Sequence, residues 1–562
     1  MTFPFHFEQI EAPAPRYEDI AAAHQEIHRL FDEATDIQGR LEAVRRWDDL
    51  RRRLETWNAL TNLRFNQDTR NEEYKKARDY CDELRPKLIE LDVKFKRKLV
   101  ESPHRRELQQ RIGSQAFALW ESEIMTYDPA IEQEMVREAK LEAEYVELLA
   151  GAQLEFRGKT YNLSEIVKFR EDPDRAVRYE SEHVRWSWFA QNAPTLDRIF
   201  DDLVNLRTQM ARKLRFDNYV GLGYKRMCRV DYTQGDVEMF RNAVRQHVVP
   251  LAQELRERQA RDLGVDELMF WDLSLHDPQG NPAPKGDHDW MLQQAQAMFD
   301  ELGGGLGEFF AAMNQSGLLD LKSREGKAGG GFCTAFPAYG APFIFANFNG
   351  SKGDVEVFTH EMGHAFQNYQ SRGLPLFDYL WPTYEACEIH SMGLEFLTWP
   401  HMEKFFGDDA ERFRKTHLTQ AILFLPYGVA IDHFQHLVYA SPEATPQERH
   451  RMWQEMERAY LPWVRYGDMP HVAQGGFWQF QRHIYLHPFY YIDYTLALTC
   501  ALQLWLRSQK DFNEAMSAYV ALCRRGGEAP FQELAASAGL ISPFAPRCLE
   551  EVIAHARTAL SV

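Results

Sequence analysis

The sequence predicts a mainly α-helical protein that contains one small β-sheet. Apolar residues recur at helical spacing along most of the 562 residues, whereas strand-like segments are few and short. Hydrophobic residues make up 44% of the chain and aromatic residues 13%, which is enough to fill a large core. Global disorder is therefore excluded, and the length permits either several domains or one large multilobed unit.

The charge balance and the cysteines exclude several classes of protein. Lys and Arg number 65 against 83 Asp and Glu, and the net charge of −18 argues against nucleic acids and anionic membranes as main partners. Seven cysteines without a CxxC pair do not suggest a disulfide framework. We expect no signal peptide, because the first 15 residues contain neither Lys or Arg nor a long apolar run, and no apolar run approaches the roughly 18 residues of a membrane span. We expect a soluble, cytoplasmic protein, and the sequence does not predict its oligomeric state.

The N-terminal region, residues 1–115, is predicted to contain long antiparallel helices, and residues 116–562 are predicted to form a second helical region. Two amphipathic stretches flank a polar break at residues 66–71. Pro86 is expected to kink or end the second helix. A partner-binding coiled coil is the alternative, although heptads with paired charges are not sustained. The apolar positions of the two stretches are Leu50, Leu54, Trp57 and Thr61, then Tyr74, Ala77, Cys81 and Leu84.

The rest of the chain is predicted as helices interrupted by two β-type segments. Residues 154–162 alternate around a glycine like a short hairpin. Residues 173–320 show helical spacing, which a loop rich in Pro, Gly and Asp breaks at 273–288. FCTAFPAY and APFIFANF, which together span 332–348, are apolar and aromatic and should form two strands of the small sheet. Helical spacing returns from Val355 onward.

The motif HEMGH at residues 360–364 carries the clearest chemical signal. On a helix, His360 and His364 lie one turn apart on the same face, so both imidazoles can bind one zinc ion. Glu361 projects from the adjoining face, where it can reach a metal-bound water without being a ligand. A His-acid-x-x-His pattern arises by chance about 0.1 times in a chain of this composition. A helix with two hydrogen-bonded histidines is therefore the alternative to a metal site.

A third metal ligand is expected, because catalytic zinc usually has three protein ligands and one open position. A second predicted helix follows the motif and carries three carboxylates along one face, Glu385, Glu388 and Glu395. A solvated acidic face is the alternative interpretation. Spacing alone does not decide between Glu385 and Glu388 as the ligand.

A second group of polar aromatic residues lies near the C-terminus. Residues 483–494 contain two His and four Tyr within 12 positions. A neutral phenol donates a hydrogen bond through its O–H group and can therefore stabilise a developing oxyanion. An aromatic core segment or an interface is the alternative. The six residues are His483, Tyr485, His487, Tyr490, Tyr491 and Tyr494.

These motifs resemble the oligoendopeptidase F and Pz-peptidase branch of the thimet oligopeptidase family of zinc metallopeptidases. The resemblance rests on HEMGHAFQ, on the upstream FCTAFPAYGAPFIFANFNGSKGD, and on the form E-x-x-S-x-x-x-E that Glu388, Ser391 and Glu395 match. It runs from about residue 154 to about residue 505 and is weakest in the N-terminal helices. In the family the first Glu of that form is the third zinc ligand, so the resemblance selects Glu388 and makes Glu385 and Glu395 supporting residues.

The resemblance also implies roles for the C-terminal group. It places a histidine and two tyrosines spaced three apart against the metal, which His483, Tyr491 and Tyr494 match. Tyr490 and His487 are the alternative register. One zinc ion held by His360, His364 and Glu388 is implied, with Glu361 as general base and the tyrosines or His483 at the oxyanion.

The implied protein is an ellipsoidal, two-lobed, zincin-type metallopeptidase with a deep central channel. Such a channel would admit short unstructured peptides, which makes the protein a zinc endopeptidase of oligopeptides. The strand APFIFANF is expected to pair with the substrate backbone if it lies at a sheet edge. The alternatives are a zinc carboxypeptidase or dipeptidyl carboxypeptidase, a metal-dependent hydrolase of another amide, and a non-catalytic helical peptide-binding protein.

Overall fold

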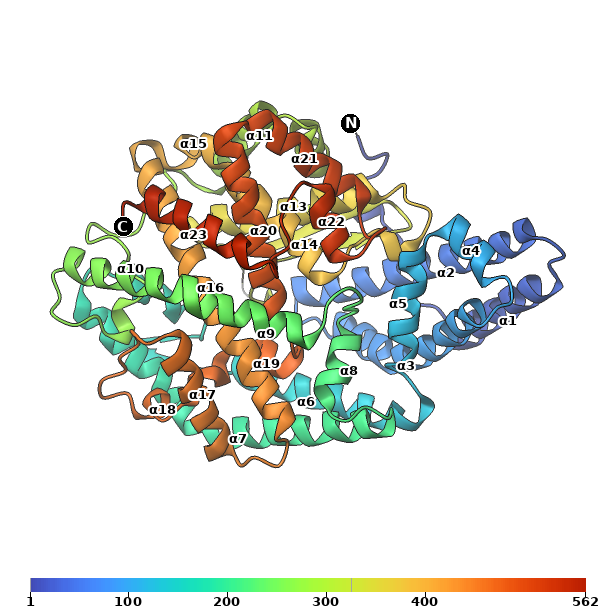
Figure 1. The fold of residues 1–562 in the computed structure, drawn as a ribbon, viewed down its shortest axis with the longest axis horizontal. Helices are drawn as coiled ribbons and strands as arrows, with labels where there is room; N and C mark the ends of the chain where they lie inside the picture. The colour runs from blue at the N-terminus through green and yellow to red at the C-terminus, as the bar shows by residue number, and fades with distance from the viewer. Residues whose placement is uncertain (1, 325) are drawn as a thin grey trace.

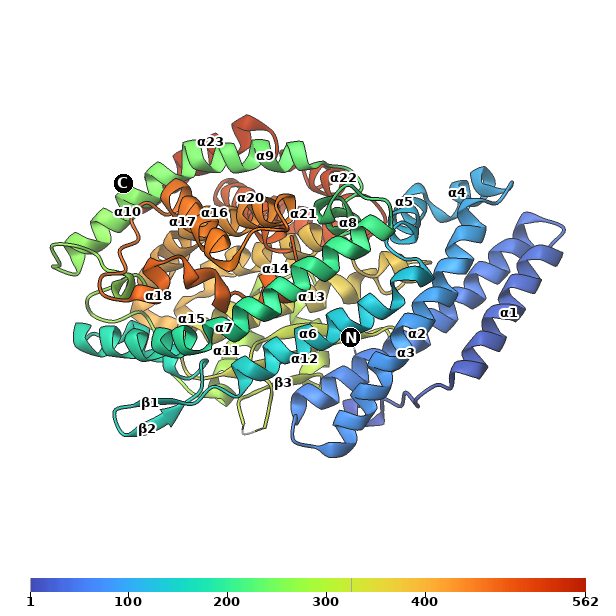
Figure 2. The same ribbon diagram turned by 90° about the horizontal axis from the view of Figure 1, so that it is seen from below.

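The computed structural model describes residues 2–324 and 326–562, and it confirms a mainly helical fold with small sheets. The molecule is elongated, with the N-terminal helices at one end and the later helices packed around its centre (Figure 1, Figure 2). No helix in the described part of the chain is both long and apolar enough to cross a membrane. All seven cysteines are unpaired thiols.

The N-terminal region forms the predicted long helices with a core of its own. Tyr74 and Cys81 lie on the second of the two predicted helices, which continues through Pro86 instead of ending there. Proline removes one backbone donor, and the buried Pro86 ring stays inside a helix of eight turns. Trp47, Phe95 and Trp120 fill the core between the helices. The bounds are α1 Tyr17–Glu33, α2 Ile37–Gln67, α3 Glu72–Val100, α4 Arg105–Ile112 and α5 Ser114–Ile124.

A buried ion pair joins this region to the rest of the molecule. Arg51 of α2 donates to Asp378, with 2.6 Å between Nη2 and Oδ2. Tyr379, next to Asp378, donates its hydroxyl to the carbonyl of Ile112 at 2.8 Å. The N-terminal helices are therefore docked on the segment that follows α13 (Lys352–Ser371). The division at residue 115 stays a prediction.

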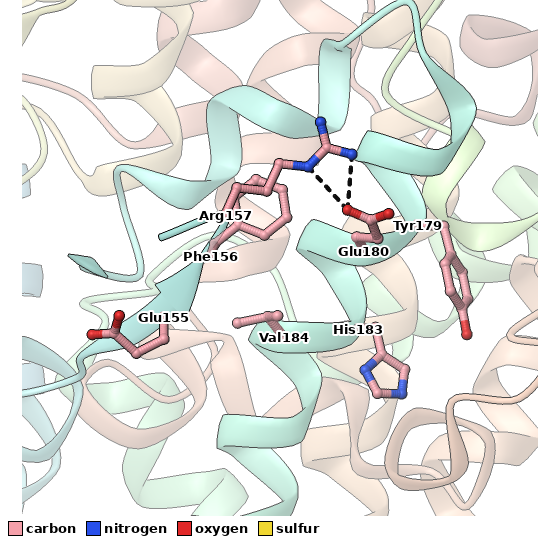
Figure 3. A pocket seen from close by; sticks show the side chains of 7 residues that line it. All are labelled: Glu155, Phe156, Arg157, Tyr179, Glu180, His183 and Val184. Atoms are coloured by element: carbon pink, nitrogen blue, oxygen red, sulfur yellow. Dashed lines mark hydrogen bonds and ion pairs between the residues drawn. The ribbon is translucent and has the colours of Figure 1, made fainter. Parts of the chain in front are cut away.

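The predicted hairpin is present as β1 (Leu154–Phe156) paired antiparallel with β2 (Lys159–Tyr161). Its two turn residues, Arg157 and Gly158, both have positive φ, which suits the twist of a two-residue hairpin. The hairpin and α7 (Arg175–Lys213) border a surface hollow of about 380 Å³, across which Arg157 donates to Glu180 (Figure 3). None of the predicted site residues lines this hollow.

The middle of the chain is helical, and the predicted surface loop separates two of its helices. The 273–287 segment contains no helix or strand and leads into α11. A π-helical turn, Val244–Val248, joins α9 to α10. The remaining bounds are α6 Glu132–Ala150, α8 Tyr219–Arg226, α9 Gln234–Ala243, α10 Val249–Asp262, α11 His288–Leu302 and α12 Leu306–Gln315.

The small sheet has three strands in the order β3-β5-β4, one more than predicted. β4 (Phe332–Phe336) and β5 (Ala341–Phe348) are the two expected strands and pair antiparallel. β3 (Leu319–Lys322) pairs parallel with β5 and was missed because four residues give too little alternation to detect. APFIFANF does not lie at the sheet edge, so the condition for its pairing with substrate is not met: β5 is central and its first six residues are buried. Its two neighbours, β3 and β4, are the edge strands.

The C-terminal half supplies the helices that surround the centre of the molecule. α14 packs against both α13 and α20, and α16 packs against α20 (Figure 1). The bounds are α14 Tyr384–Leu397, α15 Glu403–Phe406, α16 Ala410–Ala440, α17 Pro446–Tyr460, α18 Pro470–Ala473, α19 Arg482–Leu486, α20 Tyr491–Lys510, α21 Phe512–Arg525, α22 Phe531–Ser537 and α23 Pro546–Leu560.

Candidate metal centre and active site

The HEMGH motif lies in the middle of α13, as predicted. Asp354 anchors the start of this helix, because its carboxylate accepts from the backbone N–H groups of Asn349 at 3.0 Å and Gly350 at 2.7 Å. A carboxylate near a helix N-terminus is also stabilised by the helix dipole. His360 and His364 follow one turn apart, with ring centroids 5.1 Å from each other. Both imidazoles therefore point from one face of α13.

Gly363 allows the next helix to approach the motif. A Cβ atom at this position would lie 2.4 Å from the carbonyl oxygen of His390 and 2.6 Å from Cα of Ser391, both in α14. These atoms are backbone, so they cannot move aside without moving the helix. A glycine at residue 363 thus lets α14 lie directly against α13, which brings Glu388 beside the histidines.

The ligand atoms of His360, His364 and Glu388 converge within 4.8 Å of one another. Glu388 Oε2 lies 3.2 Å from His360 Nε2 and 3.3 Å from His364 Nε2. Two imidazoles and one carboxylate are a ligand set that zinc takes in catalytic sites. Among the described residues this is the group of three that fits one metal ion. Burial alone would raise the pKa of Glu388, but the nearby histidines outweigh burial and hold that pKa well below its usual range.

Two side chains fix the Glu388 carboxylate. Ser391, one turn further along α14, donates its hydroxyl to Oε2 at 2.8 Å. Tyr490 donates its hydroxyl to Oε1 at 2.7 Å from the far side of the site. Both carboxylate oxygens are therefore oriented by hydrogen bonds, and Oε2 also faces the two histidines.

A chain of hydrogen bonds sets the tautomer of His360. Trp399 Nε1–H donates to His417 Nδ1 at 3.0 Å, which leaves the proton of His417 on Nε2. His417 Nε2 then donates to Glu395 Oε2 at 2.8 Å, and Glu395 Oε1 accepts from His360 Nδ1 at 2.7 Å. In the neutral imidazole, the proton on Nδ1 leaves the lone pair of His360 Nε2 for a metal. Such carboxylate–histidine pairs are typical supports of metal ligands.

Glu361 lies beside the three metal-ligand candidates but is not one of them. Its side chain is buried, at 7% exposure, and its Oε2 has no hydrogen-bond partner among the described residues. Burial raises the pKa of Glu361 above its ordinary value. At the start of the edge strand β4, a Cβ on Gly331 would lie 3.7 Å from Glu361 Oε1. The carboxylate thus has a free oxygen next to both the cluster and the sheet edge.

The C-terminal histidine and tyrosines lie next to the metal ligands. Tyr490, from the alternative register, takes part as well as His483, Tyr491 and Tyr494. His483 Nε2 lies 3.4 Å from the Tyr494 hydroxyl, and its ring packs edge-on against Tyr491. Gln481 donates to His483 Nδ1 at 2.9 Å, which places the His483 proton on Nε2. Burial lowers the pKa of His483 to about 4, so the imidazole is neutral at pH 7. Tyr491 has no hydrogen bond among the described side chains.

Sequence reasoning gave too little weight to Tyr490 and missed His417. Tyr490 lies one turn before Tyr494, and this i, i+4 spacing is the signal that would have placed both phenols on one face. No sequence signal points to His417, which α16 brings in from 22 residues beyond Glu395. Of the two supporting acids, Glu395 contacts a histidine directly. Glu385 hydrogen-bonds neither His360 nor His364 in the described part of the chain.

One helix supplies the two histidines and the glutamate of the HExxH motif, and the next helix supplies a second glutamate. In a mainly helical chain, this arrangement is the site of an HExxH metallopeptidase. Residues 7–127 match the peptidase M3 N-terminal domain, and residues 168–552 match peptidase family M3. The chain belongs to peptidase family M3. A comparison with curated proteins gives no match.

Solved structures agree with this assignment. A structure described as an oligoendopeptidase F is 47% identical, with a TM-score of 0.96 and coverage of 99% of each chain. A Pz peptidase A with an inhibitor is 44% identical, with the same TM-score and coverage. An oligoendopeptidase F from Bacillus anthracis is 40% identical, with a TM-score of 0.92 and coverage of 100% of this chain and 99% of the other. The protein is therefore a metalloendopeptidase of the oligopeptidase type.

Proposed function

We propose that the protein is a zinc endopeptidase that cleaves internal bonds of short unstructured peptides, with one zinc ion held by His360, His364 and Glu388. The observation that carries this proposal is the convergence of the three ligand atoms within 4.8 Å. The bound zinc would supply a polarised water of lowered pKa and a Lewis acid for the scissile carbonyl. The hydrogen bonds of Glu395, Ser391 and Tyr490 would keep the three ligands in place.

Glu361 is proposed as the general base and then the general acid. Its free Oε2 would take the proton of the attacking water and pass it to the leaving amine. The raised pKa supports this role, because a carboxylate whose pKa lies closer to neutrality accepts a proton from the water more readily. The family resemblance and the position of Glu361 beside the ligands support the same assignment.

His483, Tyr491 and Tyr494 are proposed to face the substrate and the oxyanion. Burial raises the pKa of Tyr494 well above its usual range, so its hydroxyl remains a donor at pH 7. His483 is neutral and carries its proton on Nε2, next to that hydroxyl. Preorganised donors of this kind stabilise charge that develops in the transition state. Tyr490, which bonds Glu388, is proposed to orient the metal ligand.

The substrate is proposed to lie along β4. This strand is at the sheet edge, and its start adjoins Glu361. Backbone pairing with an extended peptide binds many sequences alike. Glu361 and Glu388 are buried, which favours thin, unfolded chains over folded proteins. The deep channel and a cytoplasmic location stay predictions.

Mass spectrometry of a defined peptide pool tests the proposal. Peptides of about 5 to 30 residues are incubated with wild type and with Glu361→Gln. Internal cleavage by the wild type alone supports a Glu361-dependent endopeptidase. Trimming of only one or two residues from the C-terminus would favour a carboxypeptidase or dipeptidyl carboxypeptidase instead. Equal, uncut pools would favour a binding protein.

A further inference from the structure

The residue before the tyrosines of α20 has an unusual backbone conformation. Phe489 has φ of 69°, in the left-handed region that a bulky residue rarely adopts. Its N–H donates to Gln435 Oε1 of α16 at 2.9 Å, and its carbonyl accepts from Arg229 Nη2. Such a conformation persists only where the surroundings fix it. Phe489 is thus held by partners on other elements.

The ring of Phe489 is also fixed. It packs against α8 at Gly223, where a Cβ atom would lie 2.6 Å from the ring. The rings of Tyr439 and His436 in α16 lie 5.5 and 5.0 Å away, centroid to centroid. α8 and α16 therefore clamp the side chain, while Gln435 and Arg229 hold its backbone.

Arg229 binds both ends of the turn that starts α20. The Nη2 atom that donates to the Phe489 carbonyl also lies 2.9 Å from Asp493 Oδ1. Tyr232 donates to the same carboxylate oxygen at 3.3 Å. The side chains of Arg229 and Asp493 are fully buried, and the guanidinium lies 4.3 Å from the ring centroid of Tyr224. The two N–H groups of this one nitrogen serve both acceptors, and the planar guanidinium fixes their directions, which the freely rotating ammonium of a lysine does not.

The tyrosines of the site lie inside and just beyond this turn. Tyr490 follows Phe489 and donates to Glu388, and Tyr494 follows Asp493 and meets His483. We infer that Arg229 is a positioning residue: by holding Phe489 and Asp493 it aims the hydroxyls of Tyr490 and Tyr494 at the metal centre. This inference rests on the proposed function of those tyrosines. Arg229 lies between α8 and α9 and contacts none of the site residues among those described. It would therefore act on the reaction only through Phe489 and Asp493.

The test compares Arg229→Lys with Arg178→Lys in the full-length enzyme with saturating zinc. Arg178 is the matched control, since it also forms a buried ion pair, to Asp272 at 2.8 Å, and bonds neither Phe489 nor Asp493. Asp493→Asn is the milder second variant if Arg229→Lys does not fold, because it keeps an acceptor oxygen. The melting temperature, kcat and KM are measured for each variant, alone and combined with Tyr490→Phe.

We expect both lysine variants to lower the melting temperature, while Arg229→Lys alone lowers kcat by about tenfold or more with KM nearly unchanged. Asp493→Asn should lower kcat in the same direction. The double variant with Tyr490→Phe should lose little more than the stronger single variant, because residues that act through one another are non-additive. A wild-type kcat in Arg229→Lys, or full multiplication of the two effects, would overturn the inference. Equal cleavage by wild type and Glu361→Gln would instead overturn the proposed function.

Discussion

The hydroxyl of Tyr490 and the carboxylate of Glu388 are 2.7 Å apart, although 102 residues separate them in the sequence. The bond joins the residue just before α20 to the second turn of α14. It places one donor on the carboxylate oxygen that does not face the histidines. Metal binding and the tyrosine group are therefore linked through one side chain.

Tyr490→Phe removes this donor with little change in volume. We expect zinc affinity to fall about tenfold and kcat to fall as well, because partners of metal ligands typically contribute 10- to 100-fold. Tyr384→Phe is the control, since its ring packs edge-on against Tyr490 at 4.9 Å. Zinc titration with a chelating dye measures the affinity. Equal affinities in the two variants would show that the bond does not orient Glu388.

Glu395→Gln should weaken zinc binding through His360. The amide no longer favours the proton on His360 Nδ1 as a carboxylate does, so Nε2 becomes a poorer ligand. A loss of about 10- to 100-fold in zinc affinity is expected. Glu385→Gln on the same helix serves as the control and should retain its zinc. A wild-type affinity in Glu395→Gln contradicts the proposed support of His360.

Gly363→Ala should separate α13 from α14. The added methyl group would meet backbone atoms of His390 and Ser391, which must shift. We expect a loss of about 1–3 kcal/mol of stability and of most zinc binding. Gly373→Ala is the matched control, because no atom lies within 4 Å of its added Cβ. Thermal unfolding and zinc content of both variants check this, and a stable, zinc-loaded Gly363→Ala would refute the close-contact argument.

Buried histidines should make the fold sensitive to acid. Burial lowers the pKa of His24, His390 and His436 to about 4 each, from about 6.5 in the unfolded chain. Between those values the unfolded chain binds more protons, so stability is fully present above pH 6.5 and is lost as the pH falls toward 4. The loss from pH 7.5 to 5 is about 2 kcal/mol per histidine at most.

Urea unfolding of the metal-free protein at pH 7.5 and 5 measures this loss. A lower midpoint is expected at pH 5, and His436→Asn should show a smaller difference than the wild type. An unchanged midpoint in the wild type would mean that these histidines are protonated in the folded protein too.

The sequence predicted those features that local spacing determines. Helical periodicity gave α2, α3 and α13, and the i, i+4 spacing put His360 and His364 on one face. The family resemblance, not spacing, selected Glu388 over Glu385. Features that depend on tertiary packing were not predictable from one sequence, such as the central position of β5 and the approach of His417 to Glu395. Pro86 shows the same limit, since packing keeps a helix that local chemistry alone would end.

Zinc content per chain decides whether His360, His364 and Glu388 form a zinc site. Wild type, Glu361→Gln and Glu388→Ala are purified without chelators, and zinc is measured by mass spectrometry of the metal. We expect about one zinc per chain in wild type and in Glu361→Gln, and little in Glu388→Ala. The same zinc content in all three proteins, or none in the wild type, would contradict this expectation.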